Sequence, residues 1–327
     1  MPRHDVAAVG NAIVDVLAPA EDAFLAREGL AKGSMGLIDA ARATELYGRM
    51  GGGVEASGGS AANTVAGVAS LGGRAAYVGK VGDDALGEVF TREIAGGGVT
   101  FHPAVGRGEL TGRCLVNVTP DGQRTMSTFL GAASALTPQD VDTAVIEDAA
   151  IVYLEGYLFD PEPARRAFEL AADAARVGGG RTALTLSDAF VVERHREELL
   201  RFLPRIDILL ANEAEVLALW RTTDREAALA LTAEAVPLAA VTLGAEGSVV
   251  LRREQRFPVA AEPVAAVVDT TGAGDQYAAG FLLGLARELT PEACARLGHL
   301  AAAEVISHFG PRPQTPLEPL ARAAGLL

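Results

Sequence analysis

The chain has 327 residues, of which 49% are hydrophobic and 21% charged, a composition that supports a sizeable core and excludes general disorder. Its 42 acidic and 28 basic residues give a net charge of −14, which argues against a nucleic-acid partner because such binding relies on Lys and Arg to neutralise phosphates. Two cysteines occur, and the sequence shows no signal peptide and no apolar run of about 18 residues, so we expect a cytoplasmic protein without a disulfide framework or a membrane partner.

Short apolar runs alternate with helical patterns along most of the chain. We expect buried strands at residues 6–9, 75–81, 151–154, 182–186, 206–210, 239–243 and 248–251. Helices are expected between them at residues 61–71, 84–94, 162–176, 191–202 and 212–220. This order predicts an α/β fold with a mostly parallel sheet covered by helices on both faces.

One stretch interrupts the alternation. Residues 111–118 and 124–130 flank Pro120-Asp121-Gly122, which is typical of a β-hairpin. With residues 12–17 and 37–39 they are expected to form a small antiparallel sheet that serves as a lid. Beyond Gly272 the chain is predicted to be mostly helical, with Pro291 at a helix start and Gly310-Pro311 at a stop.

The most informative motif runs from Val267 to Asp275. A short apolar strand is expected to enter a Gly272-Ala273-Gly274 turn that opens a long helix near Asp275. Small residues let the backbone approach a phosphate, and the first-turn N–H groups of a helix are free donors. A carboxylate at such an anion site is suited to take a proton from an attacking hydroxyl. The plainer interpretation is that Asp275 caps the helix and the glycines make a turn.

Three further groups of polar residues follow strands or open helices. Gly58, Gly59 and Asn63 belong to a second small-residue turn that would bring backbone and an amide to a polar ligand. Asn11 and Asp15 follow the first strand, where a carboxylate suits a vicinal diol. Asn212 and Glu215, three apart on one helix face, suit the waters of a magnesium ion; ordinary turns and a solvated helix start are the alternatives.

The familiar nucleotide-binding signatures are missing. Around Gly79-Lys80 the P-loop pattern fails, and no G-x-G-x-x-G follows a strand. The five histidines show no zinc-ligand spacing. A dinucleotide-dependent hydride-transfer enzyme is therefore disfavoured.

Taken together, the motifs resemble those of the ribokinase-like (PfkB) family of sugar and nucleoside kinases. Residues 58–63 stand where its first signature stands, residues 269–275 match its second, and Asn212-x-x-Glu215 matches its magnesium-associated motif. The resemblance covers essentially the whole chain, and it implies a single three-layer α/β/α domain over residues 1–327. The lid would be formed approximately by residues 12–40 and 99–130.

Finer features resemble the adenosine kinase branch, among them residues 10–15, 111–114, 184–190 and 207–213. By this resemblance Asp275 is the base, and the amides of residues 272–274 form the anion hole. Ribose hydroxyls would be held by Asp15, Gly59 and Asn63, and the base pocket would be lined by Asn11, Met35, Leu37, Cys114 and Leu158. Around ATP and its phosphates the resemblance places Thr242, Gly244, Gly247, His299 and Arg124. It places Glu215 at Mg²⁺ through water, and Asp269 and Thr271 at a K⁺ site.

The sequence thus predicts an ATP- and Mg²⁺-dependent kinase acting on a primary hydroxyl of a small molecule, most simply the 5′-hydroxyl of adenosine. A sugar kinase acting on ribose, fructose or a keto-deoxy sugar acid is the alternative within the family, and a non-catalytic nucleoside- or sugar-binding relative is the alternative outside catalysis. Met35 and Leu158 depart from eukaryotic adenosine kinases, which bears on the identity of the base. Monomer and homodimer both remain open.

Overall fold

The main domain is built on a nine-stranded sheet, seen in a computed structural model that describes residues 2–327. The strand order is β16-β15-β14-β13-β12-β11-β1-β5-β7, parallel from β14 to β7 and antiparallel at β15 and β16. The strands are β1 (His4–Val9), β5 (Ala75–Val78), β7 (Val99–Phe101), β11 (Ala149–Glu155), β12 (Arg181–Thr185), β13 (Ile208–Asn212), β14 (Leu238–Thr242), β15 (Ser248–Arg252) and β16 (Gln255–Val259).

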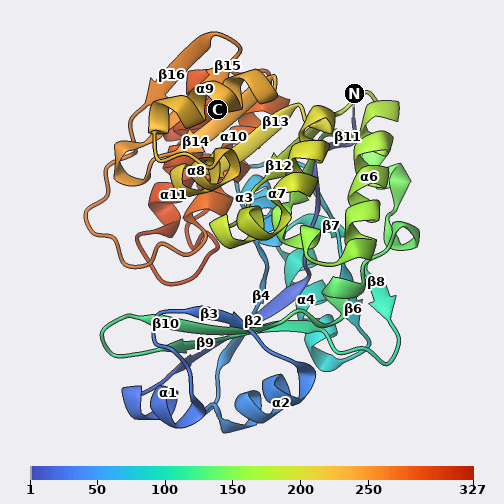
Figure 1. The fold of residues 1–327 in the computed structure, drawn as a ribbon, viewed down its shortest axis with the longest axis vertical. Helices are drawn as coiled ribbons and strands as arrows, with labels where there is room; N and C mark the ends of the chain where they lie inside the picture. The colour runs from blue at the N-terminus through green and yellow to red at the C-terminus, as the bar shows by residue number, and fades with distance from the viewer. Residues whose placement is uncertain (1) are drawn as a thin grey trace.

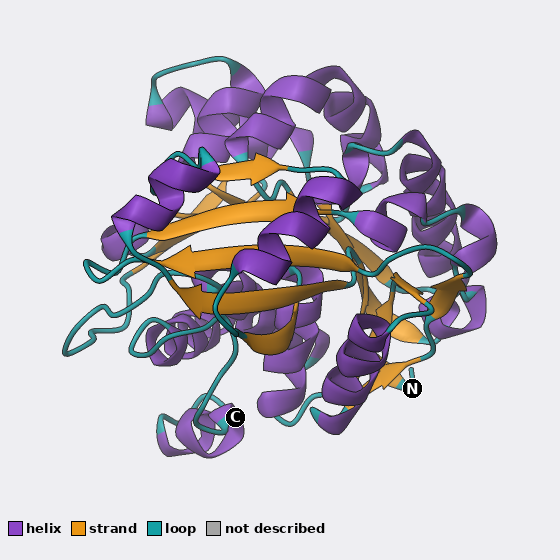
Figure 2. Ribbon diagram, turned by 90° about the horizontal axis from the view of Figure 1, so that it is seen from below, coloured by secondary structure: helices purple, strands orange, loops and turns teal. Residues whose placement is uncertain are grey.

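Helices cover both faces of this sheet, as Figure 2 shows. Successive side chains of β1 enter opposite cores: Val6 and Ala8 pack on one face, Ala7 and Val9 on the other, because strand side chains alternate. The first face carries α3 (Ser60–Ser70), α4 (Ala85–Gly96), α10 (Ala273–Ala286), α11 (Pro291–Val305) and α12 (Leu317–Ala323). The second carries α5 (Thr143–Glu147), α6 (Glu162–Val177), α7 (Ala189–Phe202), α8 (Glu213–Trp220) and α9 (Arg225–Ala235). The predicted three-layer α/β/α fold is confirmed.

The lid is a separate five-stranded sheet below the main domain in Figure 1. Its order is β3-β10-β9-β2-β4, formed by β2 (Ile13–Pro19), β3 (Met35–Leu37), β4 (Val54–Gly58), β9 (Gly112–Val118) and β10 (Arg124–Phe129). The predicted hairpin of β9 and β10 is antiparallel, but β2 pairs with β9, and β10 with β3, in parallel. The lid sheet is therefore mixed rather than antiparallel.

The lid boundaries also differ from the expected 12–40 and 99–130. The first segment extends to β4, which pairs with β2, and so ends at Gly58. The second begins at β9, because β7 belongs to the main sheet and β8 (Ala104–Gly106) pairs with β6 (Lys80–Gly82) in a two-stranded sheet. The predicted strand 75–81 accordingly divides at Gly79 between two sheets.

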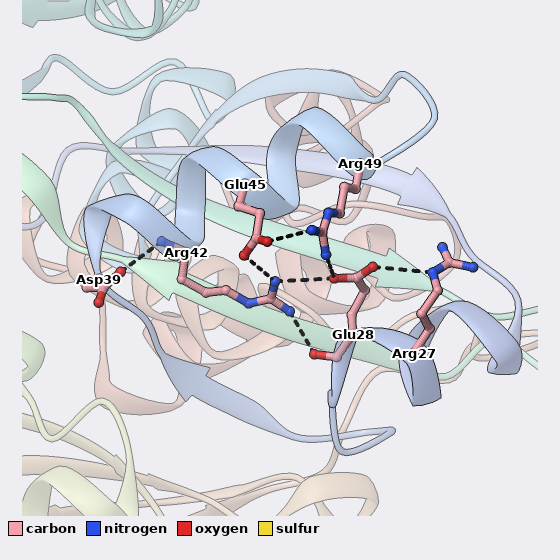
Figure 3. A network of polar contacts seen from close by, with 6 residues as sticks. All are labelled: Arg27, Glu28, Asp39, Arg42, Glu45 and Arg49. Carbon is pink, nitrogen blue, oxygen red and sulfur yellow. Dashed lines mark hydrogen bonds and ion pairs between the residues drawn. The ribbon is translucent and has the colours of Figure 1, made fainter.

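Two helices, α1 (Asp22–Glu28) and α2 (Ala40–Arg49), cover the lid face that is turned away from the main domain (Figure 1). Figure 3 shows how they are joined: the buried Glu28 carboxylate accepts from Arg42 at 3.2 Å and Arg49 at 2.9 Å. Glu45 pairs with the same two arginines. Asp39 caps α2 by accepting from the Arg42 N–H. These bonds fix the outer layer of the lid.

The predicted strand before the Gly272 turn is wrong. Residues 260–271 have no regular structure, and the Val268 N–H donates to the Ile306 carbonyl, beyond the end of α11, instead of to a sheet. Both Val267 and Val268 are largely exposed, so this apolar pair does not mark a buried strand. In the described chain no helix is both long and apolar enough to traverse a bilayer.

Candidate active site

A cavity of about 750 Å³ lies between the lid sheet and the carboxyl ends of the parallel strands. The main domain contributes the residues at or just after β1, β11, β12, β13 and β14, the position at which open α/β sheets bind ligands. These are Asn11, Glu155, Thr185, Asn212 and Thr242. The lid contributes Asp15, Met35, Leu37, Cys114, Met126 and Thr128. The cavity thus has a polar floor and a partly apolar roof.

Helix α10 points its N-terminus into the cavity. Gly272 adopts φ +79°, and a Cβ there would lie 2.6 Å from Cα of Pro311, so the turn requires glycine. The Ala273 N–H donates to the Thr270 carbonyl. Within residues 2–327 no acceptor is bonded to the N–H groups of Gly274 and Asp275. The amides of Gly274 and Asp275 are therefore free to donate to an anion. Of the predicted set, residues 272–274, the Ala273 N–H already has an acceptor, so the anion hole stays a prediction with a changed set of donors.

Asp275 lines the cavity beside these amides. Its carboxylate accepts from Ser60 Oγ at 2.6 Å and from Asn63 Nδ2 at 3.1 Å. Burial raises the pKa of Asp275, and the bonds from Ser60 and Asn63 oppose that rise. A carboxylate that is partly desolvated and held by two donors is suited to receive a proton. It does not cap the helix, whose N-cap is Gly272.

A second carboxylate, that of Asp15, reaches the cavity from β2 of the lid. It lies against Gly58 of β4, where a Cβ would come within 2.4 Å of the carboxylate oxygen. Burial, followed by the nearby Asp275, raises the pKa of Asp15 to about 6, while Arg312 and Arg124 lower it. Gly59 lines the cavity as predicted. Asn63 is buried behind Asp275 and does not line it.

Asn11 is held by a residue that the sequence did not single out. Glu155, at the end of β11, accepts from Asn11 Nδ2 at 2.8 Å and from the Ala61 N–H at 2.8 Å. Burial raises the pKa of Glu155 to about 7, against the effect of these hydrogen bonds. The bond to Glu155 fixes which way the Asn11 amide faces, and it leaves Asn11 Oδ1 buried without a protein partner in the described residues.

The apolar part of the cavity contains Met35, Leu37 and Cys114, as the resemblance implied, together with Ile13, Met126 and Leu130. Leu158 is not part of it. Its side chain is fully buried in the core beneath the helices of the second face, so the prediction that it lines the base pocket is wrong. Its neighbour Tyr157 lines the cavity instead, because the short 3₁₀ helix Gly156–Phe159 turns adjacent side chains to opposite sides.

Asn212 and Glu215 form a reciprocal cap at the start of α8. The Glu215 N–H donates to Asn212 Oδ1 at 2.9 Å, while Glu215 accepts from the Asn212 N–H at 3.0 Å and from its side-chain amide at 2.7 Å. Both residues line the cavity. Burial raises the pKa of Glu215 to about 7. The predicted helix start is confirmed, and the same pair faces the space where ligand would bind.

Of the other residues expected around ATP, only Thr242 lines the cavity. Gly244 and Gly247 lie in the turn between β14 and β15, and their place beside ATP stays a prediction. His299 is buried, its Nε2 is 2.9 Å from Ser248 Oγ, and its ring meets Tyr277 edge-on. Burial lowers its pKa to about 4. The structure therefore does not support a place for His299 beside ATP.

Arg124 extends from the lid strand β10 to the loop that precedes α10. It forms an ion pair with Asp269 and donates to Thr271 Oγ1 at 2.7 Å. Asp269 also accepts from the N–H groups of Thr271 at 3.0 Å and Gly310 at 2.9 Å. These contacts connect the lid to Thr271, which lines the cavity beside the start of α10.

Comparison with known proteins shows the family to which the chain belongs. Residues 30–317 match the family model described as pfkB family carbohydrate kinase. The chain belongs to the pfkB family. It is similar to the crystal structure of adenosine kinase from Sinorhizobium meliloti, with 51% identity, a TM-score of 0.92 and coverage of 98% of this chain and 99% of that one.

Two further similarities bear on the acceptor. A probable sugar kinase from Rhizobium etli CFN 42 shares 46% identity with a TM-score of 0.94, covering 100% of both chains. Adenosine kinase from Saccharomyces cerevisiae is 29% identical, covering 93% of this chain and 95% of the yeast protein. The protein is therefore a nucleoside or sugar kinase of the pfkB family, acting on a small molecule.

Kinases of the pfkB family use ATP, typically with Mg²⁺, and the donor set fits a magnesium ion. Mg²⁺ keeps several waters and takes only one or two carboxylates besides substrate phosphates, so the absence of a cluster of three ligating side chains in residues 2–327 does not argue against it. Glu215, with Asn212, is the pair that would hold its waters. A potassium ion at Asp269 and Thr271 does not fit, because Arg124 and two backbone N–H groups already occupy the Asp269 carboxylate.

Proposed function

We propose that this pfkB kinase transfers the γ-phosphoryl group of ATP to the 5′-hydroxyl of a nucleoside, with adenosine the preferred acceptor. The observation that carries the proposal is the cavity itself, which joins the carboxylate of Asp15 to an apolar lining donated by the lid. A carboxylate suits the two hydroxyls of a ribose, and an apolar lining suits a flat base. Similarity to the Sinorhizobium meliloti adenosine kinase at 51% identity supports the same acceptor.

In this proposal Asp275 accepts the proton of the acceptor hydroxyl as its oxygen attacks the transferred group. The Gly274 and Asp275 N–H groups, which have no bonded acceptor in residues 2–327, donate to the charge that develops there. Phosphoryl transfer needs positioning and charge stabilisation rather than a covalent intermediate. Magnesium, held through Glu215, would supply further neutralisation of phosphate charge. The lid excludes water, which would otherwise compete as acceptor.

The preference for a nucleoside follows from the surface that each acceptor would bury. A free sugar would hydrogen-bond to the Asp15 carboxylate but leave the side chains of Met35, Leu37 and Cys114 in contact with water. A base covering them would bury on the order of 100 Å² of apolar surface, worth about 2–3 kcal/mol or roughly fifty-fold in specificity. Loss of the 2′-hydroxyl would leave the Asp15 carboxylate short of a partner, at about 1–3 kcal/mol.

A sugar acceptor is the second candidate, and the observation in its favour is the 46% identity to the Rhizobium etli chain described as a probable sugar kinase. A sugar kinase would use Asp275 and the α10 amides in the same way. The two candidates differ only in what fills the apolar part of the cavity.

The experiment is an ADP-release assay with adenosine, inosine, guanosine, 2′-deoxyadenosine, ribose, fructose and a keto-deoxy sugar acid. We expect adenosine to exceed ribose, fructose and 2′-deoxyadenosine by at least tenfold in kcat/KM. Met35→Ala should reduce that advantage while leaving kcat/KM for ribose unchanged, since in this proposal the methionine would contact the base and not the sugar. A sugar that outperforms every nucleoside would replace the adenosine proposal with the sugar-kinase one.

A further inference from the structure

Arg312 lies next to the proposed catalytic carboxylate, although it belongs to none of the motifs. Its Nε donates to Asn63 Oδ1 at 3.1 Å, and its Nη1 donates to Ser57 Oγ at 2.5 Å. The amide nitrogen of the same Asn63 donates to Asp275 at 3.1 Å. Because a guanidinium can only donate, the side-chain oxygen of Asn63 must face Arg312, and its NH2 group then faces Asp275. Arg312 therefore fixes the orientation of the Asn63 amide.

The segment that carries Arg312 is fastened to the start of α10. Gln276 Nε2 donates to the Pro311 carbonyl and to the Asn63 carbonyl, both at 3.0 Å. Gly310 donates to Asp269 at 2.9 Å. Pro311 fills the space beside Gly272 that a side chain would need. Arg312 thus reaches Asn63 from a backbone segment that is hydrogen-bonded to α10 and to the loop before it.

Arg312 also brings positive charge to a cluster that contains the carboxylates of Asp15, Glu155 and Asp275. It lowers the pKa of Asp15 and of Asp275, opposing their burial. Its Nη2 is enclosed and has no acceptor in the described residues, and a buried cation with an unpaired donor costs folding free energy. Such a charge is expected where it serves a site. The titratable groups around Asp275 and Arg312 are Asp15 from β2, Tyr77 from β5, Glu93 from α4, Arg124 from β10, Tyr153 and Glu155 from β11, and Tyr157.

We propose that Arg312 is a positioning residue for phosphoryl transfer: it turns the Asn63 amide towards Asp275, and it places a positive charge beside the carboxylates of Asp15 and Asp275. The inference rests on the proposed function, because it gives Asp275 the role of base. It holds equally for a nucleoside and for a sugar acceptor, since both would react at Asp275.

The test compares Arg312→Gln, Arg312→Lys and the control Arg322→Gln, an exposed arginine of α12 paired with Glu318. All are assayed with the acceptor that wild type uses best, over pH 5 to 9. Loss of a positive charge near a carboxylate raises its pKa by about one unit or more. Arg312→Gln should therefore move the acidic limb of kcat/KM up by about one pH unit and recover at high pH. Arg312→Lys and Arg322→Gln should leave the limb in place.

A second measurement covers the case in which Arg312→Gln does not fold. Arg312→Lys keeps the charge but cannot hold Asn63 and Ser57 in one planar fork, so its kcat should fall several-fold. In an Asn63→Ala background the same substitution should cost less than twofold, because the group it orients is gone. Equal losses in both backgrounds, or an unmoved acidic limb in a folded Arg312→Gln, would overturn the inference while wild type remains active. A wild type that phosphorylates no acceptor would instead overturn the proposed function on which it rests.

Discussion

Replacing Gly272 by alanine tests whether the turn before α10 has the strict requirement that the structure shows. At φ +79° an L-residue is strained by about 1–2 kcal/mol. The added Cβ would lie 2.6 Å from Cα and from the carbonyl oxygen of Pro311, and forcing an atom into a packed site costs about 1–3 kcal/mol more. We therefore expect a loss of about 3 kcal/mol in the free energy of unfolding. For a chain of this size that corresponds to a fall in Tm of roughly 4 °C.

The matched control is Gly274→Ala, two residues further into the same helix. A Cβ at Gly274 meets nothing within 4 Å, and alanine is favoured over glycine in a helix by up to about 1 kcal/mol. Its Tm should equal or exceed that of wild type, while its kcat/KM should fall because the methyl group occupies the space beside the free amides. Gly272→Ala should lose both stability and activity. A Gly272→Ala protein that melts within 1 °C of wild type, measured by calorimetry, would refute the steric argument.

Three other predictions follow from single contacts. Burial raises the pKa of Glu155 from an ordinary 4.5 to about 7, so the stability linked to its protonation is present below about pH 4.5 and is lost as the pH rises through 7. Glu155→Gln should therefore be less stable than wild type at pH 5 by about 1–3 kcal/mol. Urea melts should show this difference in stability closing at pH 8, and a difference that is the same at both pH values would contradict the assignment. Arg124→Ala should lower kcat more than tenfold, because the charge on the transferred group is greatest in the transition state. Titration calorimetry should show that ATP affinity changes less than threefold. An effect on ATP affinity alone would contradict a role for Arg124 in the transition state. Leu158→Ala should cost about 2–5 kcal/mol of stability with no change in KM for the acceptor. A raised KM together with wild-type stability would show that Leu158 lines the acceptor pocket after all.

The sheet could be predicted because its strands are locally conspicuous. Strands β1, β11 and β14 are continuous apolar runs, as expected where both faces are covered. Strand β4, with the sequence VEASG, and the edge strand β16, with QRFPV, have no such pattern. Only pairing with β2 and β15 makes them strands. Val267 and Val268 gave the opposite error, because an exposed loop can contain valines.

The site could be predicted where a motif couples a turn to a helix, as at Gly272 and Gly59. Glu155 and Arg312 could not be found in this way. Glu155 ends an apolar strand with no flanking signal, and Arg312 lies 249 positions from the Asn63 it orients. Their importance arises from tertiary contacts that no local pattern reports. His299 shows the converse, since a motif position predicted a ligand contact and the packing of α11 against Ser248 and Tyr277 buried it.

The central claim is that Asp275 is the base of a phosphoryl transfer, and the most direct test is the turnover of Asp275→Asn. The amide has nearly the same shape and can still bond to Ser60, but it cannot accept the proton. Wild type and variant should be compared for kcat under saturating acceptor and ATP, with Tm and ATP affinity measured on the same samples. The account predicts a fall in kcat of roughly 10²–10⁴-fold with the fold and ATP affinity retained. A variant that turns over at more than about a third of the wild-type rate would contradict it.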